Sequence, residues 1–449
     1  MFLGAVHDVS RAWDVGYYHM PFAARLGGIV PAKAYLFSAD NEARFHGFPL
    51  LGELLQALLW RVTGDAAATN LLAWSSLGVF ALFLKRELGV RARYAVLALL
   101  GIPLVHVHAT SSYVDLPGNV ALAILVLVAM DAWGAREFVS VRKLAWALGG
   151  AAVAANTKAL LQPLVLLALV ALSIRVVPPL VQGVRTQGRS RRTLIALVLA
   201  LPVVFASPLK NAALHGNPFF PVAVHALGVD LPGPEEAYAS APDWLSQAPR
   251  PLRFAASVLE IGVRPLTDPR RWTVDQWTPP SAPGYRMGGF FGAYVLVEIV
   301  LLGWRVAKDP TRRVRAPALG FAGLTLVVSV MPQCHELRYY MAWMIVLVSV
   351  NLWLAPSPRL LAIVSSASVL AVLLVTRAGY AYPSGSTFAE LVEEQVDPRV
   401  LGRVRDGDRV CVQKEPYDLL WAAPFHPPRD YVVKEAESRE DCDGEAPLE

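Results

Sequence analysis

Long apolar blocks, almost free of charged side chains, recur along most of the chain. A helix needs about 20 apolar residues to cross the hydrocarbon core of a bilayer, and most of these blocks approach that length. The chain is therefore predicted to be an all-α polytopic membrane protein with about ten transmembrane helices. The predicted spans are residues 66–84, 94–110, 116–133, 144–156, 159–177, 193–209, 290–306, 316–332, 337–355 and 359–376.

The loops between these spans alternate in charge. Short loops rich in Lys and Arg stay in the cytoplasm. The basic loops lie at residues 85–93, 134–143, 175–192 and 305–315. The segments that alternate with them are expected outside the cytoplasm: residues 1–65, 111–115, 210–289, 332–336 and the tail after residue 376.

Residues 47–62 are apolar enough to be mistaken for a further span. They contain Glu53, Gln56 and Arg61, and a crossing here would place every basic loop outside. An interfacial helix on the outer face is therefore expected. Both chain ends then lie outside, and the first residues lack the basic start of a signal peptide. We expect a further span upstream of the start.

The pattern divides the chain into three regions. Residues 1–65 are predicted to be an external catalytic loop with interfacial helices, and residues 66–376 a helical bundle with an external loop at 210–289. Residues 377–449 hold nine basic and sixteen acidic side chains. Short apolar runs between turn residues at 408–414 and 430–435 predict strands there, and hence a small external α/β appendage.

Composition supports a membrane protein. Of the 449 residues, 55% are hydrophobic and 17% charged, against about 45–50% and about 25% in soluble domains. No nucleic-acid partner is expected, because the basic residues are confined to the loops. Of the three cysteines, Cys411 and Cys442 are a possible disulfide in an oxidising space, while Cys334 is expected to be single.

Side chains capable of chemistry gather at the predicted outer ends of the spans. They are Asp14, Tyr17, Tyr18 and His19 in WDVGYYHMPFAARL, Asp115 in HVHATSSYVDLPGN, Lys158 in NTKALLQP, Lys210 in SPLKNAALHGNPFFP, and His335, Glu336 and Arg338 in PQCHELRYY. A carboxylate beside a hydroxyl or amine acts as a general base, and Lys or Arg neutralises a phosphate leaving group. The set fits group transfer from a lipid phosphate.

Each of these residues has a simpler interpretation. A single Lys or Arg at a span end usually anchors the helix in the headgroups. Asp14 and Asp115 could each cap the helix that follows. His106 and His108 have no carboxylate or cysteine nearby in sequence to complete a metal site. Glu298, inside a predicted span, is either a functional acid or a hydrogen-bond partner of a neighbouring helix.

Taken in order, the motifs resemble those of the GT-C superfamily of polytopic glycosyltransferases, over roughly residues 8–355. WDVGYYHMPFAARL is similar to the first external loop, where an Asp precedes a Tyr-His pair and a Pro. FHGFPLLGELL resembles the helix that follows that loop, and ATSSYVDLPGNVAL the second acidic motif. NTKALL, LKNAALHGNPFFP and ELRYYMAWM resemble later family segments. The most similar branches are the protein O-mannosyltransferases, aminoarabinose transferases and lipopolysaccharide-core transferases.

The resemblance implies an inverting glycosyltransferase that uses a polyprenyl-phosphate-linked sugar. Transfer to a glycan, lipid or protein acceptor would occur on the periplasmic face of the inner membrane. The matching acid of the first loop is Asp14, which is the expected general base, and Asp115 is the expected second acid. Lys158, Lys210 and Arg338 are expected to face the phosphate. The remaining residues expected to bind substrate are Tyr18, His19 and Glu336.

The resemblance implies no cofactor, since this branch is thought to work without a metal ion, although two acids could hold a divalent cation. Two other functions are compatible with the sequence. A lipid-linked-sugar flippase or other transporter would place its polar groups near the midplane of the bilayer, whereas here they gather at one face. A membrane scaffold with a partner-binding tail is the third possibility.

Overall fold

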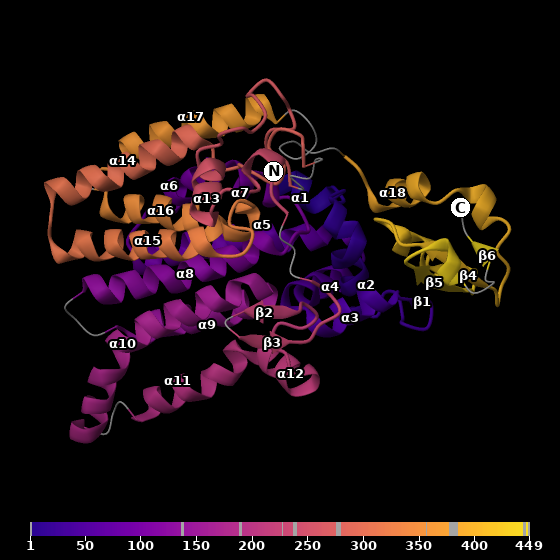
Figure 1. The fold of residues 1–449 in the computed structure, drawn as a ribbon, viewed down its shortest axis with the longest axis horizontal. Coiled ribbons are helices and arrows are strands. Elements are labelled where there is room, and N and C mark those ends of the chain that lie inside the picture. The colour runs from indigo at the N-terminus through magenta and orange to yellow at the C-terminus, as the bar shows by residue number, and fades with distance from the viewer. Residues whose placement is uncertain are drawn as a thin grey trace.

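The computed structural model describes residues 2–135, 139–187, 191–226, 228–236, 240–274, 280–355, 357–376, 385–442 and 446–447. Long helices lie side by side in one elongated bundle, and a small sheet stands at one end of it (Figure 1). Parts of two predicted basic loops, at 136–138 and 188–190, and the start of the predicted C-terminal region lie outside the described residues.

Twelve helices form the described part of the bundle. They are α5 (Leu71–Glu87), α6 (Ala92–Leu100), α7 (Pro103–His108), α8 (Asp115–Gly134), α9 (Val141–Thr157), α10 (Gln162–Gln187), α11 (Arg191–Val204), α12 (Ala206–His215), α14 (Gly292–Lys308), α15 (Arg312–Val330), α16 (Met341–Leu354) and α17 (Arg359–Val375). Helix α8 is central and packs against α5, α9, α10, α15 and α16. In agreement with this cover on all sides, residues 120–130 of the helix are apolar around its whole circumference.

Five of the ten predicted spans are long and apolar enough to cross a membrane. These are Ala66–Glu87, Asp115–Gly134, Ala159–Gln182, Arg312–Val330 and Leu337–Leu354, and the bent pair α11 and α12 adds a sixth if it counts as one span. They fit a multi-pass membrane protein.

The other predicted spans are shorter or broken. Residues 94–110 form two helices, α6 and α7, rather than one. Helices α9, α14 and α17 have 17 residues each, or about 25 Å at 1.5 Å per residue, slightly less than the hydrocarbon core. Ten crossings therefore remain a prediction.

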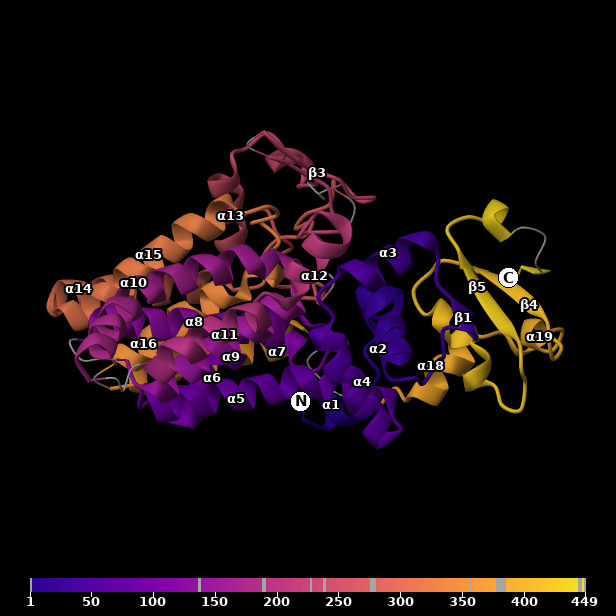
Figure 2. The ribbon, with the colours of Figure 1, turned by 90° about the horizontal axis from the view of Figure 1, so that it is seen from below.

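The N-terminal region packs between the bundle and the sheet, as both views show (Figures 1 and 2). It contains α1 (Phe2–His7), a π-helical turn (Val15–His19), α2 (Met20–Leu26), α3 (Ala39–Gly47) and α4 (Leu51–Thr63). Helix α4 occupies most of the segment predicted to be interfacial.

The C-terminal strands share one sheet with a strand of the N-terminal region. The parallel sheet has the order β1 (Tyr35–Leu36), β5 (Val432–Ala436), β4 (Arg409–Gln413) and β6 (Ala446–Pro447), so its first strand comes from the N-terminal region. A two-residue strand leaves no alternating pattern in the sequence, which is why it was not predicted. Helices α18 (Phe388–Gln395) and α19 (Pro398–Leu401) complete this part.

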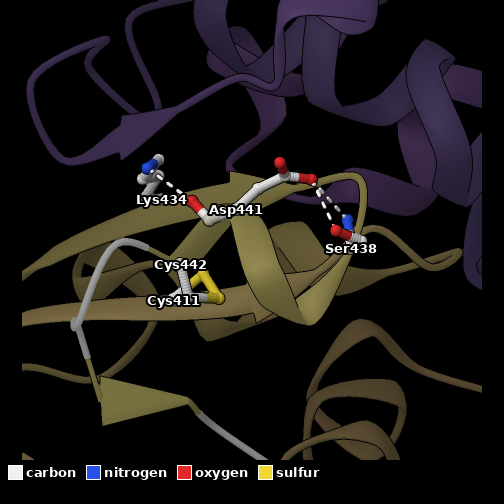
Figure 3. The surroundings of a disulfide bond; sticks show 5 residues. All are labelled: Cys411, Lys434, Ser438, Asp441 and Cys442. Carbon is white, nitrogen blue, oxygen red and sulfur yellow. Dashed lines mark hydrogen bonds between the residues drawn. A yellow bond between two sulfur atoms is a disulfide. The ribbon is translucent and has the colours of Figure 1, made fainter.

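Cys411 and Cys442 form a disulfide, and Cys334 is free and buried. The disulfide joins β4 to the turn after β5, where Ser438 and Lys434 both donate hydrogen bonds to Asp441 (Figure 3). The loop predicted at 210–289 carries the end of α12, a hairpin of β2 (Val224–Ala226) and β3 (Val229–Leu231), and α13 (Arg250–Val258).

Candidate active site

The opening motif folds into an unusual local structure. The π-helical turn Val15–His19 leads directly into α2, with Pro21 in its first turn. Single π-helical turns are rare and are frequent at functional sites. Asp14 precedes the turn but makes no side-chain cap to it. Its Oδ2 instead accepts a hydrogen bond from Nη1 of Arg338 at 3.0 Å, so the capping interpretation of Asp14 has no support.

Arg338 binds three side chains at once. Its Nε donates to Oε1 of Glu336 at 2.7 Å, its Nη1 to Asp14 and its Nη2 to the hydroxyl of Tyr339 at 2.9 Å. The Arg338 side chain is only 6% exposed. A planar guanidinium fixes the directions of its donors, so Arg338 holds the Asp14 carboxylate at the start of α16.

A second acid–base pair lies beside the first. Asp115 opens α8, Lys158 follows the end of α9, and their Oδ1 and Nζ atoms are 2.6 Å apart. The Asp115 side chain is fully buried. Its Oδ2 accepts no hydrogen bond within the described part of the chain. Asp115 therefore faces Lys158 and keeps one oxygen for a hydroxyl donor.

The ring of Tyr339 joins the two pairs. Nζ of Lys158 lies 4.5 Å from the ring centroid, and Cζ of Arg338 lies 4.8 Å from it. Cations are attracted to the face of an aromatic ring at such distances. We call the six residues Asp14, Asp115, Lys158, Glu336, Arg338 and Tyr339 the charged cluster. It unites four segments that are far apart in the sequence.

Glu336 extends the cluster to the external loop. Its Oε2 is 3.3 Å from Nη1 of Arg286, and its Oε1 already accepts from Arg338. The Glu336 side chain is completely buried, so both oxygens are neutralised by guanidinium groups. Arg286 was not predicted, because it lies in an irregular Gly- and Pro-rich stretch without a motif.

His19 is buried against Glu53 rather than against the charged cluster. Nδ1 of His19 and Oε1 of Glu53 are 2.7 Å apart, with the two side chains 2% and 3% exposed. The His19 ring meets the ring of Tyr113 edge-on at 5.6 Å. The hydroxyl of Tyr113 accepts a hydrogen bond from the backbone N–H of Asp14 at 3.3 Å. Glu53 and Tyr113 thus position the Asp14 segment, although neither was singled out as a site residue.

Helix α4 reaches this position because of a glycine. A Cβ atom at Gly52 would lie 2.5 Å from a methyl carbon of Val114, at the entrance to α8. Real Cβ atoms essentially never come this close to another heavy atom, so a larger residue would push α4 outward. The glycine allows Glu53, the next residue, to meet His19.

Tyr18 and Lys210 lie at the edges of the site. The ring of Tyr18 packs against those of His19 and Phe48, at 4.3 and 5.8 Å. Burial raises the pKa of Tyr18 well above its usual value, and the Asp14 charge adds to the rise, so the phenol remains a hydrogen-bond donor. Lys210 is exposed, and its described hydrogen bond goes to the carbonyl of His46 at the end of α3. The structure does not bring Lys210 into the charged cluster.

The charge balance keeps Asp14 ionised. Burial raises the pKa of the Asp14 carboxyl, but the charges of Arg338 and His19 lower it by more, and the net pKa lies below the usual value. The side chain is 20% exposed. A ligand can therefore reach this carboxylate in its anionic form.

An apolar groove of about 470 Å³ runs along the bundle. It lies between α5, α8 and α9, from Leu72 and Pro117 at one end to Arg142 and Trp146 at the other. In the sequence, Pro117 closely follows Asp115.

Within the described residues, no group of three or more His, Cys, Asp and Glu side chains is placed to hold a metal ion. Each acid of the charged cluster is instead paired with a cation. The arrangement offers one solvent-accessible carboxylate, buried cations that attract a phosphate, and an unused oxygen on Asp115.

No protein-family model matches the chain, and no curated protein sequence is significantly similar. The fold is similar to that of ArnT from Cupriavidus metallidurans, whose crystal structure is of the apo state. The TM-score is 0.54, the sequence identity 13%, and the match covers 99% of this chain and 84% of the ArnT chain. The fold expected from the motif resemblance is thereby confirmed: the architecture of the chain is similar to that of ArnT.

Proposed function

We propose that this chain is an integral membrane glycosyltransferase that moves a sugar from a polyprenyl-phosphate carrier to an acceptor outside the cytoplasm. The observation that carries the proposal is the charged cluster, in which Asp14, Asp115, Lys158 and Arg338 meet from distant segments. Buried ionic networks are costly to assemble. Their presence at the end of a bundle with the ArnT fold favours a catalytic role.

The proposed reaction is a single inverting displacement. An acceptor hydroxyl or amine attacks the anomeric carbon and loses its proton to the Asp14 carboxylate. The bond between that carbon and the phosphate oxygen breaks, and polyprenyl phosphate leaves with the electron pair. Lys158 and Arg338 neutralise the negative charge that the phosphate gains. The free oxygen of Asp115 accepts a hydrogen bond from a sugar or acceptor hydroxyl.

Asp14 is a weak base while Arg338 holds it. Burial alone would raise its pKa, but the Arg338 charge is the largest of the opposing effects that lower it. A donor phosphate is a strong competitor for the same guanidinium. When Arg338 turns to the phosphate, Asp14 is released and its proton affinity rises. Donor binding thus prepares the base before the acceptor reacts.

The apolar groove supports a lipid carrier. Its walls are mostly apolar, and Pro117, in the first turn of the helix that Asp115 opens, lines one end of it. A polyprenyl tail fits such a surface without burying polar groups. The basic loops favour a cytoplasmic location for the opposite end of the bundle, so the reaction would take place on the periplasmic face of the inner membrane.

The test uses purified full-length protein in bilayer nanodiscs with a radiolabelled polyprenyl-phosphate sugar. Release of free polyprenyl phosphate together with a labelled acceptor supports the proposal. Measuring the movement of labelled donor in sealed vesicles distinguishes a glycosyltransferase from a transporter. A flippase moves the intact labelled donor between leaflets without breaking the sugar–phosphate bond. Translocation without cleavage, across a panel of glycan and lipid acceptors, would overturn the proposal.

A further inference from the structure

A second pocket lies at the other end of the bundle. It has a volume of about 630 Å³ and is lined mainly by the ends of α5 and α8 and the starts of α9 and α15. The charged cluster lies where α8 begins and α9 ends, so the two sites are at opposite ends of the same helices. The charged and aromatic side chains of the pocket are Glu87, Asp131, Lys143, Arg312, Arg313 and Trp353.

One wall of the pocket carries the carboxylate of Glu87, of which only one oxygen has hydrogen-bond donors among the described residues. The Glu87 side chain is fully buried. Its Oε1 is 2.7 Å from Nε of Arg142 and accepts a hydrogen bond from Nε1 of Trp146 at 3.1 Å. Its Oε2 is buried and accepts no hydrogen bond from the described residues. Leaving a buried charged oxygen without a donor is costly, and a ligand with an N–H group would remove the cost.

The opposite wall is built to hold an anion. Thr311, Arg312 and Arg313 line the pocket at the N-terminus of α15. Among the described residues, Thr311 makes no side-chain cap to that end of the helix, and Asp309 accepts a hydrogen bond only from the N–H of Thr311 itself. The first N–H groups of a helix attract anions together with the helix dipole. Arg312 and Arg313 add two guanidinium groups. Phosphate is the anion that such a combination favours.

We propose that this pocket binds the ethanolamine phosphate headgroup of an aminophospholipid. The phosphate would lie at the start of α15, between Arg312 and Arg313, and the primary ammonium would donate to Oε2 of Glu87. A choline headgroup has no N–H donor for Glu87, and a glycerol headgroup has no positive charge. The ligand would thus be recognised by its pair of opposite charges, the phosphate and the ammonium, rather than by its net charge.

A lipid is favoured over free phosphoethanolamine by the position of the pocket. It opens among the ends of apolar helices, with Trp353 in its wall, and tryptophan is enriched where hydrocarbon meets headgroups. The adjoining loops are the basic ones that are expected in the cytoplasm. The site would therefore take a lipid from the cytoplasmic leaflet and fix the depth of the bundle in the membrane.

Native mass spectrometry of the detergent-solubilised full-length protein tests the proposal. Phosphatidylethanolamine, its N-methyl, N,N-dimethyl and choline derivatives, and phosphatidylglycerol, all with the same acyl chains, are titrated separately. Removing the last N–H donor should weaken binding about tenfold, the effect of losing one hydrogen bond to a charged group. Equal binding across the methylated series in wild-type protein would overturn the proposal without any variant.

Substitutions locate the site. Glu87→Gln should reduce phosphatidylethanolamine binding about tenfold and leave phosphatidylglycerol binding unchanged, which also shows that the variant is folded. Arg313→Ala should weaken both lipids. Arg315→Ala, an exposed change outside the pocket on the same helix, should alter neither. A preference for ethanolamine that survives Glu87→Gln would contradict the site, and displacement by micromolar free phosphoethanolamine would contradict a lipid as the ligand.

Discussion

The two ends of the bundle use charged side chains in different ways. At the end that carries the charged cluster, Asp14 and Arg338 pair although they are far apart in the sequence, and their side chains are 20% and 6% exposed. At the other end, Lys143 pairs with Asp131 on the preceding helix. Glu87 pairs there with Arg142, whose side chain is 67% exposed.

The first end buries a network that joins four distant segments, whereas at the second end Glu87 is also buried but pairs with a single exposed arginine. Removing two charges from water usually costs more than their attraction returns, unless further hydrogen bonds compensate. Exposed pairs carry little cost and contribute little. Helix ends that are only anchored in headgroups need no buried network, so a network that joins four distant segments indicates a further role. The following experiments test this contrast.

The largest expected effect is in a test of membrane topology, because an introduced cysteine is either labelled from outside the cell or not labelled at all. In a Cys334→Ala background, Arg86→Cys is expected to be unreactive towards an impermeant maleimide added outside intact cells, and Trp244→Cys is expected to react. Both side chains are exposed, Trp244 by 53%, so burial does not explain a difference. Labelling of Arg86→Cys from outside would exchange the two ends and contradict the proposed reaction.

Asp14→Asn should lower turnover by about 10²–10⁴-fold, the usual contribution of a positioned general base. The amide keeps the size of the carboxyl but cannot accept the acceptor's proton. Donor affinity and thermal stability should stay near wild type. Single-turnover kinetics with labelled donor checks the rate. Wild-type turnover in Asp14→Asn would remove Asp14 from the role of base.

Arg338→Lys should weaken donor binding by about 10–100-fold. A lysine keeps the charge but cannot present a planar pair of donors to two phosphate oxygens, and each lost bond to a charged group costs about 1.5–3 kcal/mol. Equilibrium binding of a non-hydrolysable polyprenyl-phosphate analogue measures the loss. Lys210→Ala is the matched control, because Lys210 lies outside the cluster in this structure. A larger loss in Lys210→Ala would show that the family-based role of Lys210 holds when the donor is bound.

The stability of the contact between the parallel sheet and the N-terminal region should depend on pH. Burial raises the pKa values of Asp418 and Glu435, and the Glu435 charge raises that of Asp418 further. Above the ordinary carboxyl pKa of about 4, the folded state therefore holds protons that the unfolded state has released. The contribution of this pair to the free energy of unfolding consequently falls as the pH rises from about 4 through the raised pKa values of the folded state. Asp418→Asn should raise the melting temperature by about 2–4 °C at pH 8, and by less at pH 5. An equal change at both pH values would exclude this titration as the cause.

The smallest effect is expected at an exposed pair. Arg11 and Glu394 are 2.7 Å apart, with side chains 41% and 51% exposed. Arg11→Ala should change the free energy of unfolding by less than about 1 kcal/mol and leave transfer unchanged. Chemical denaturation followed by tryptophan fluorescence gives the value. A loss as large as that of Arg338→Lys would mean that burial does not distinguish the two kinds of pair.

The sequence predicted most of the charged cluster. Asp14, Asp115, Lys158, Glu336 and Arg338 were recognisable because titratable groups stand out against apolar spans and recur in motif order. Their roles remain predictions. The contact of Tyr339 with the two cations could not be predicted, because the orientation of its ring depends on how α16 packs against α8. Lys210 was expected in the same place, but the bend between α11 and α12, 55° in the structure, directs that segment towards α3.

Span counting was limited by length and by breaks. A hydropathy pattern does not distinguish a continuous span from two helices that meet at a bend, as α6 and α7 do at residues 101 and 102. The strands at 409–413 and 432–436 agree closely with the predicted runs. Their partner β1 was not predictable, because its pairing depends on a contact between the N-terminal region and the C-terminal strands.

That contact affects how the protein is made. Strand β5 is encoded near the end of the sequence, yet it pairs with β1, which follows soon after the Asp14 segment. Glu435 also accepts hydrogen bonds from Ser38 and Asn41, and Asn41 in turn donates to the carbonyl of Tyr17. The segment that carries Asp14 thus receives its full support only when β5 has been synthesised. Under the proposed function, copies whose translation stops before β5 are expected to be inactive towards the lipid carrier.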